Sequence, residues 1–293
     1  MTALQERLRG GVLAAVPVPC SGREINESAQ RSYAASMAGE PLAGVAVWAH
    51  TGRGPHLSPE QRRTVIEAWR EALPGKVVVA GVHDIGTAID ARRRDADALL
   101  IFPVADDPVR HHDRLSRELP GILFWLYEAA GGVAYDDATL HRLLDLPHII
   151  GIKIATLDSV MTYQRLVSLV RAHPEKLILT GEDRFLGYSM LAGADAALIG
   201  MAAAVPALAT GLFHARDAED HARFIALTRA ADAFAAATFH EPMEGYIRRM
   251  LWAAAAEGRI PEDACDDPWG PALAVESRAH LARAVKDALS ALG

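Results

Sequence analysis

The chain has 293 residues, of which 51% are hydrophobic and 23% are charged, and its formal net charge is -7. An acidic chain has no positive field for phosphate backbones or anionic lipids, so we expect neither nucleic acid nor a membrane as partner. The length suits two ordinary domains or one large α/β barrel. Cys20 and Cys265 fit no metal or redox spacing, so a reducing, cytoplasmic location is expected.

Short apolar runs recur along the chain and predict eight strands. Their hydrophobicity is continuous, which is typical of parallel strands covered on both faces. The runs are 11–17, 44–49, 76–82, 98–103, 121–127, 148–154, 176–181 and 195–201. Helical patterns between them predict a (β/α)8 TIM barrel. A doubly wound open sheet is the alternative, but PVPCSGRE after the first run is a poor match to the Gly-rich loop it requires.

Capping residues mark the starts of several helices. Ser58, Pro59 and Gln61 form an N-terminal signature ahead of an apolar stripe. Thr87 and Asp158 are similar candidate caps for two later helices.

Only helical patterns follow residue 220. We therefore expect a catalytic barrel over residues 1–222 and a C-terminal helical region over 223–293. This region would pack on the barrel, because no linker of the kind that separates independent domains precedes it.

The residues that end the predicted strands are the candidate site, because barrels of this type carry their chemistry at the C-terminal ends of the strands. In chain order they are His50–Gly54, His83–Asp84, Pro103, Tyr127–Glu128, Lys153, Gly181–Asp183 and Ile199–Gly200.

Lys153 and Tyr127 end consecutive strands, which lie about 4.8 Å apart in a sheet. Burial in an apolar barrel lowers the pKa of a lysine, and a neutral amine can attack a ketone to form an imine. A tyrosine hydroxyl can shuttle protons as the carbinolamine collapses and the leaving group departs. Alternatively, Lys153 reaches solvent or pairs with Glu182 or Asp183, and Tyr127 only packs.

The turn Thr51-Gly52-Arg53-Gly54 has two glycines, so its backbone N–H groups can approach an anion closely. Together with the Thr51 hydroxyl it would hold a carboxylate. It lacks the P-loop pattern, which disfavours a nucleotide phosphate. An ordinary β-to-α turn is the alternative.

The ordered set of motifs resembles the dihydrodipicolinate synthase/N-acetylneuraminate lyase family. GIK ends the sixth predicted strand, LY ends the fifth, and a TG turn precedes LSPEQR. The match in layout runs from about residue 11 to the C-terminus. The resemblance implies a (β/α)8 barrel with C-terminal helices, class I Schiff-base aldolase or dehydratase activity, and a homotetramer or homodimer.

Carried over position by position, the resemblance makes Lys153 the imine-forming lysine and Tyr127 the proton-shuttling tyrosine. Thr51 and Gly52 would bind the carboxylate of a small 2-oxo acid, and Ile199 would line the pyruvyl pocket. We expect no cofactor and no metal ion at this site.

Several positions depart from the family pattern. Its Gly-Thr-Thr-Gly-Glu turn reads AHTGR at 49–53, and its Pro-Tyr-Tyr motif reads PVA at 103–105, so the inter-subunit tyrosine relay is missing. YEAAGG at 127–132 replaces Tyr-Asn-x-Pro, and no arginine for a second substrate carboxylate stands near it. These departures disfavour a dihydrodipicolinate synthase and leave the imine chemistry with an altered specificity.

The preferred function is a lyase that acts on a 2-oxo acid, most simply a pyruvate-forming aldolase for a 2-keto-3-deoxy sugar acid. His50 and Glu128 would contact the hydroxylated tail or assist protonation. A dehydratase of the same family is an alternative.

Two further functions remain open. His50 and His83 end adjacent strands near Asp84 and Glu182, a set that suits zinc or manganese in a metal-dependent barrel enzyme. A chain that keeps the amine but has lost turnover would instead bind a keto acid as a sensor. Chelator treatment would test the first function, and an adduct without product release would indicate the second.

Overall fold

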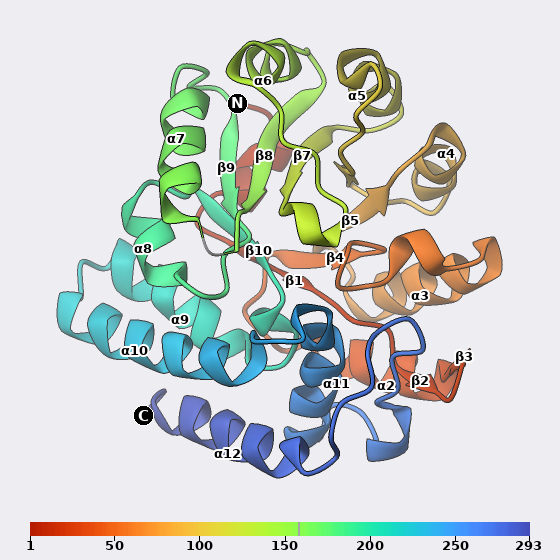
Figure 1. The fold of residues 1–293 in the computed structure, drawn as a ribbon, viewed down its shortest axis with the longest axis vertical. Helices are drawn as coiled ribbons and strands as arrows, with labels where there is room; N and C mark the ends of the chain where they lie inside the picture. Colours follow the sequence, from red (N-terminus) through yellow and green to blue (C-terminus); the bar gives the residue numbers. More distant parts are fainter. Residues whose placement is uncertain (158) are drawn as a thin grey trace.

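A computed structural model of the chain, which describes residues 1–157 and 159–293, contains a closed barrel of eight parallel strands (Figure 1). They are β1 (Val12–Ala15), β4 (Gly44–Val47), β5 (Val77–Val82), β6 (Ala98–Ile101), β7 (Gly121–Leu126), β8 (Ile149–Ala155), β9 (Leu177–Thr180) and β10 (Ala196–Ile199). Strands adjacent in the chain are adjacent in the barrel, and β1 closes it by pairing with both β4 and β10. The predicted (β/α)8 TIM barrel is confirmed, and each strand overlaps its predicted run. A small ribbon of β2 (Cys20–Ser21) and β3 (Glu24–Ile25) was not predicted.

Helices surround the barrel, as the periodicity between the apolar runs predicts (Figure 1). Those that follow the eight strands are, in order, α2 (Glu27–Ser36), α3 (Pro59–Ala72), α4 (Ile85–Arg93), α5 (Pro108–Ser116), α6 (Asp137–Leu144), α7 (Val160–Val170), α8 (Leu186–Leu191) and α9 (Pro206–Asp217). None of the helices in the described residues has the length and apolar composition that a membrane span requires.

The capping prediction for α3 is confirmed, because Ser58 and Gln61 form a reciprocal capping box with Pro59 in the first turn. The prediction that Thr87 caps α4 is wrong. Asp84 is the N-cap, and its carboxylate accepts a hydrogen bond from the Thr87 amide inside the helix. Asp158 lies outside the described residues.

The C-terminal helices are α10 (His221–Thr238), α11 (Tyr246–Ala256) and α12 (Ser277–Ser290). α10 packs along α8 and α9, and α12 packs against α10 and α11, so these helices extend one side of the barrel (Figure 1). Their apolar side chains join the hydrophobic cluster between the strands and the helices. A division at residue 222 falls in the first turn of α10.

A second hydrophobic cluster fills the barrel interior. Leu8 of the short helix α1 (Ala3–Leu8) belongs to it, and Gln5 of the same helix donates a hydrogen bond to the Ile150 carbonyl at 3.0 Å. Because α1 precedes β1, it covers the end of the barrel at which the strands begin. The opposite end, at the C-terminal ends of the strands, carries the candidate site.

Candidate active site

Lys153 lies in β8, and an irregularity in this strand determines which way it faces. Gly121 of β7 pairs with Ile149 of β8, but Ile122 pairs with Gly151, so β8 contains one extra residue. An extra residue of this kind, a β-bulge, exchanges the two faces of the strand beyond it.

Beyond the bulge, Ile152 and Ile154 pack toward the helices, whereas Ala155 belongs to the interior cluster. Lys153 alternates with the two isoleucines and therefore points into the barrel. Its side chain is buried, with 6% exposed, and Nζ lies 4.4 Å from the centroid of the Phe124 ring.

Burial lowers the pKa of Lys153 to about 8, although the charges of Asp183 and Glu182 oppose the shift. The structure supports neither alternative reading of this lysine. The side chain is almost fully buried, and within the described residues no ion pair joins it to either carboxylate. The result is a shielded amine that loses its proton more readily than a lysine in water.

The two neighbouring carboxyl groups form other hydrogen bonds that hold the ends of the strands. Glu182 accepts hydrogen bonds from the Thr156 hydroxyl at 2.9 Å and the Leu157 amide at 3.0 Å. Asp183 accepts them from the Met201 amide at 2.7 Å and the hydroxyl of a tyrosine in α11 at 3.1 Å. Burial raises the pKa of Glu182 to about 7, and that of Asp183 also rises above its usual range because of burial.

Tyr127 directly follows β7 and packs against the interior cluster. Its hydroxyl donates a long hydrogen bond of 3.5 Å to Oε1 of Glu244, and its ring meets that of His50 edge-on at 6.1 Å between centroids. Burial, followed by the charge of Glu244, raises the pKa of Tyr127, so the phenol is protonated at neutral pH. The charge of Asp183 acts on both Tyr127 and Lys153, which lie at the same end of the barrel.

The turn after β4 is compact, and Thr51 within it is buried. A Cβ atom at Gly52 would lie 3.0 Å from the Val16 carbonyl oxygen, so the turn packs closely on the end of β1. The amide of Arg53 donates to the His50 carbonyl, whereas within the described residues the amides of Thr51 and Gly52 donate no hydrogen bond. These two N–H groups are the ones predicted to hold a carboxylate.

Arg53 connects this turn to the C-terminal part of the chain. Its side chain is 6% exposed and contacts Asp267 through Nε at 3.1 Å and Nη2 at 2.6 Å. Nη1 donates to Oε2 of Glu244 at 2.8 Å, and Oε1 of Glu244 lies 3.1 Å from Nε2 of His50. Burial raises the pKa of Glu244, but the hydrogen bonds and charges of His50 and Arg53 outweigh it and lower the pKa to about 2.

Sequence reasoning did not find three residues at this end of the barrel, Glu244, Tyr246 and Asp267, and it gave the side chain of Arg53 no partner. Glu244 belongs to η4 (Met243–Gly245), and Tyr246 begins α11, in the region expected only to pack on the barrel. One signal was available. An arginine in the turn position where the family has a glutamate implies a carboxylate partner elsewhere in the chain.

Two of the predicted site residues are not brought to Lys153. Glu128 is exposed in η2 (Glu128–Ala130), at the rim of the barrel. Ile199 packs in the cluster between strands and helices, whereas its neighbour Leu198 faces the interior.

The two histidines of the metal hypothesis contact different carboxylates. His83 lies 3.3 Å from its neighbour Asp84, while His50 contacts Glu244. In the part of the chain that the structure describes, no three His, Cys, Asp or Glu side chains are grouped to hold a metal ion.

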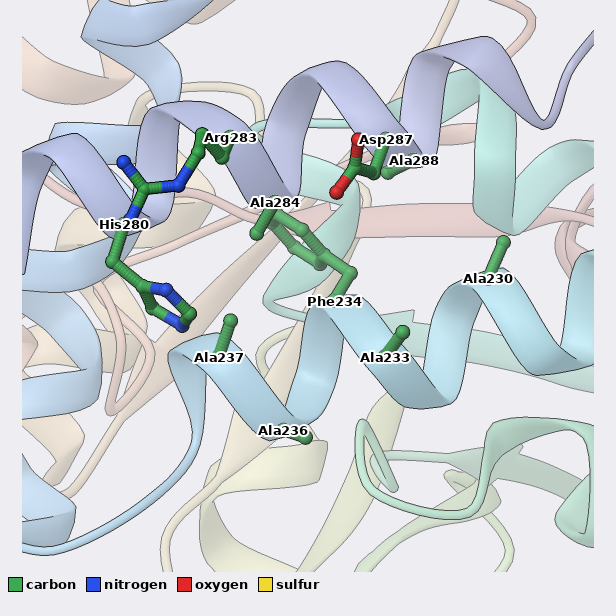
Figure 2. Close-up of a pocket in the computed structure, with 10 residues that line it drawn as sticks. All are labelled: Ala230, Ala233, Phe234, Ala236, Ala237, His280, Arg283, Ala284, Asp287 and Ala288. Carbon is green, nitrogen blue, oxygen red and sulfur yellow. The ribbon is translucent and has the colours of Figure 1, made fainter.

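The barrel mouth contains a small hollow of about 20 Å³ beside Tyr127, Asp183, Arg184 and Phe239. A groove of about 420 Å³ lies elsewhere, between α10 and α12 (Figure 2). Alanines of α10 and the side chains of α12 line the groove, and none of the candidate site residues does. The smaller hollow is the one next to the buried amine, because Gly181 lines it and a Cβ at residue 181 would lie 2.7 Å from Cε of Lys153.

Comparison with known proteins supports this fold along most of the chain. The chain is 29% identical over 256 residues to a 4-hydroxy-tetrahydrodipicolinate synthase of Nitrobacter hamburgensis, covering 82% of this chain and 84% of that protein. A catalytic lysine mutant of Ruminococcus gnavus sialic acid aldolase superposes with a TM-score of 0.84 at 19% identity, covering 99% and 98% of the two chains. YagE of E. coli K12 in complex with pyruvate gives a TM-score of 0.83 at 19% identity, covering 95% and 98%.

The fold and the family match define an enzyme of the class I, Schiff-base aldolase and lyase type. Residues 111–288 match the model of the dihydrodipicolinate synthetase family. The chain belongs to this family.

Proposed function

We propose that the protein is a lyase that cleaves a 2-keto-3-deoxy sugar acid, or a related 2-oxo acid, into pyruvate and an aldehyde through an imine on Lys153. The observation that carries the proposal is the amine of Lys153, which is buried, turned into the barrel and has a pKa of about 8. An amine in this state is nucleophilic near neutral pH. The similarity to Ruminococcus gnavus sialic acid aldolase, whose structure is that of a catalytic lysine mutant, adds support.

In the proposed binding mode, the substrate carboxylate lies on the Thr51 and Gly52 amides and the Thr51 hydroxyl. The hollow beside Tyr127 holds about one water molecule, so the side chains around it would move apart to admit the substrate. His50 would meet the hydroxyl groups of the tail, and Glu128 would reach only its outer end, from the rim.

In the proposed mechanism, Tyr127 carries protons between the reacting atoms. The amine attacks C2 and passes one of its protons to the carbonyl oxygen, which gives a carbinolamine. Tyr127 then gives its proton to the carbinolamine hydroxyl, so water leaves and a C2=N iminium forms. The C3–C4 bond then breaks, and its electron pair forms the enamine as the C4 hydroxyl returns a proton to Tyr127 and becomes an aldehyde. Tyr127 then gives this proton to C3, and water hydrolyses the resulting imine, which releases pyruvate, returns a proton to Tyr127 and restores the neutral amine.

We expect a homodimer or homotetramer, the states that the family resemblance implies, which light scattering would measure. Tyr127 contacts His50 and Glu244 of its own chain.

Turnover of 2-keto-3-deoxygluconate and 2-keto-3-deoxygalactonate tests the proposal. Equal amounts of pyruvate and glyceraldehyde are expected, and Lys153→Met should abolish both, while Lys286→Met, which removes an exposed lysine, should leave them unchanged. Loss of water without an aldehyde would identify a dehydratase. An adduct that borohydride traps without release of product would identify a binder.

A further inference from the structure

Three donors converge on one carboxylate beyond Tyr127. His50 Nε2 lies 3.1 Å from Oε1 of Glu244, the Tyr127 hydroxyl lies 3.5 Å from the same oxygen, and Arg53 Nη1 lies 2.8 Å from Oε2. Two β-strand ends therefore fix a carboxylate that comes from the C-terminal part of the chain.

The charges in this cluster are unequally accessible. The Arg53 and Asp267 side chains are 6% and 2% exposed and are bound to each other, whereas the Glu244 side chain is 35% exposed. The positive charge of Arg53 is thus buried and shared between two carboxylates. An incoming molecule meets the negative charge of Glu244, together with the half-buried ring of His50.

The position of Glu244 relative to a substrate follows from the proposed function, on which this inference rests. If Tyr127 exchanges a proton with the C4 hydroxyl, Glu244 next to it faces C5 and the atoms beyond. A carboxylate there can accept hydrogen bonds from hydroxyl groups and repels a second carboxylate.

We propose that Glu244 is a specificity-determining residue that makes the enzyme select an uncharged, hydroxylated aldehyde half and reject one that carries a carboxylate beside the aldehyde carbon. His50 supports this selection because it holds Glu244 in place and because, within the part of the chain that the structure describes, its Nδ1 makes no hydrogen bond and is left for a substrate hydroxyl. Arg53, which replaces the family's glutamate in the turn after β4, also takes part in this selection because it anchors Glu244.

Arg184 is the cation that could oppose this selection, because it lines the same hollow. Its Nη1 donates to the Phe239 carbonyl at 3.1 Å, and its charge acts on Asp232 of α10. Arg184 is therefore directed toward the C-terminal end of α10 and toward Asp232.

The test runs the reaction toward synthesis, with pyruvate and either glycolaldehyde or glyoxylate. These aldehydes have two carbons each and differ in having a hydroxymethyl group or a carboxylate. The value of kcat/KM is measured with each aldehyde in the parent enzyme and in Glu244→Gln. The quantity compared is kcat/KM for glycolaldehyde divided by kcat/KM for glyoxylate. The ratio should fall by about tenfold or more in the variant, because removal of one partly exposed charge relieves like-charge repulsion.

A comparison of ratios cancels both the intrinsic reactivity of the aldehydes and any general loss of rate from weaker positioning of Tyr127. Glu241→Gln is the matched control, because Glu241 is exposed three residues earlier and its side chain contacts the Met243 amide. Its ratio should equal that of the parent. In the parent, raising the salt concentration from about 0.1 M to about 1 M shortens the Debye length from about 10 Å to about 3 Å and should lower KM for glyoxylate alone.

An unchanged ratio in Glu244→Gln would overturn the proposal, and so would a parental preference for glyoxylate that Arg184→Gln removes. If Glu244→Gln does not fold, the salt dependence of KM in the parent enzyme is the test. An equal change in KM for both aldehydes would then overturn the proposal. If the proposed function itself is wrong, the result is different. Neither aldehyde would then react with pyruvate in a reaction that depends on Lys153, as judged by its loss in Lys153→Met.

Discussion

Lys153 and Gly181 share one space at the mouth of the barrel. A Cβ atom at residue 181 would lie 2.7 Å from Cε of Lys153 and 3.0 Å from Cβ of Ala155. Real side chains do not approach so closely, so the absence of a side chain at the end of β9 allows the lysine to extend inward from β8.

Gly181→Ala should therefore displace the amine. We expect the rate of imine formation with pyruvate to fall by about tenfold or more, because a misplacement near 1 Å at a reacting group can cost as much as about 10²-fold. Overpacking should lower the stability by about 1–3 kcal/mol. Borohydride trapping measures the rate, and Gly39→Ala is the control, because a Cβ at residue 39 meets no atom within 4 Å. Equal trapping rates in Gly181→Ala and Gly39→Ala would show that a Cβ at residue 181 does not displace Lys153.

The pKa of Lys153, about 8 in the folded chain against 10.5 for an ordinary lysine, predicts two pH effects. The rate of imine formation should rise about tenfold per pH unit below pH 8 and level off above it, because only the neutral amine attacks. Below pH 8 the amine is charged in both the folded and the unfolded chain, so the full free-energy cost of burying that charge destabilises the fold. This cost disappears as the pH rises toward 10.5. Lys153→Met should thus raise Tm more at about pH 7 than at about pH 10. A flat rate profile from pH 6 to 9 would mean that the amine is not shielded.

Tyr127→Phe should slow turnover more than it weakens binding. Loss of a positioned proton donor typically costs about 10²-fold or more in kcat, while the phenyl ring still packs in the interior cluster. The pyruvate adduct on borohydride treatment should still form, with little change in KM. Tyr188→Phe, at an exposed tyrosine, is the control. A parental kcat in Tyr127→Phe would show that the proton shuttle is another group.

Arg53→Met should destabilise the fold by about 3–5 kcal/mol, because it leaves the buried Asp267 without a counter-charge. Asp267→Asn in the same chain should restore part of the loss, since no buried charge then remains unpaired. Urea denaturation of the two single variants and the double variant measures the coupling. Additive effects would indicate that the ion pair contributes nothing.

The sequence was sufficient to predict the barrel because each of its strands is a continuous apolar run and each run overlaps a strand of the structure. It also identified Lys153 at a strand end, from its position after HIIGI. The direction of that side chain was not predictable, because it depends on one extra residue in β8, and a one-residue shift exchanges the faces of a strand. Local periodicity carries no information about such a shift.

The carboxylates that contact the turn after β4 were also beyond local reasoning. Arg53 meets Glu244 and Asp267 across 191 and 214 residues, and these contacts exist only after the C-terminal helices pack on the barrel. Ile199 illustrates the opposite error, since a position carried over from the family said nothing about which face of β10 its side chain would occupy.

The central claim is that the ε-amine of Lys153 forms the imine. The most direct measurement is borohydride reduction in the presence of pyruvate, followed by mass spectrometry of the digested protein. We predict a single reduced pyruvyl adduct on the peptide that contains Lys153, and its loss in Lys153→Met. No adduct, or an adduct on Lys76, Lys176 or Lys286 instead, would contradict the account.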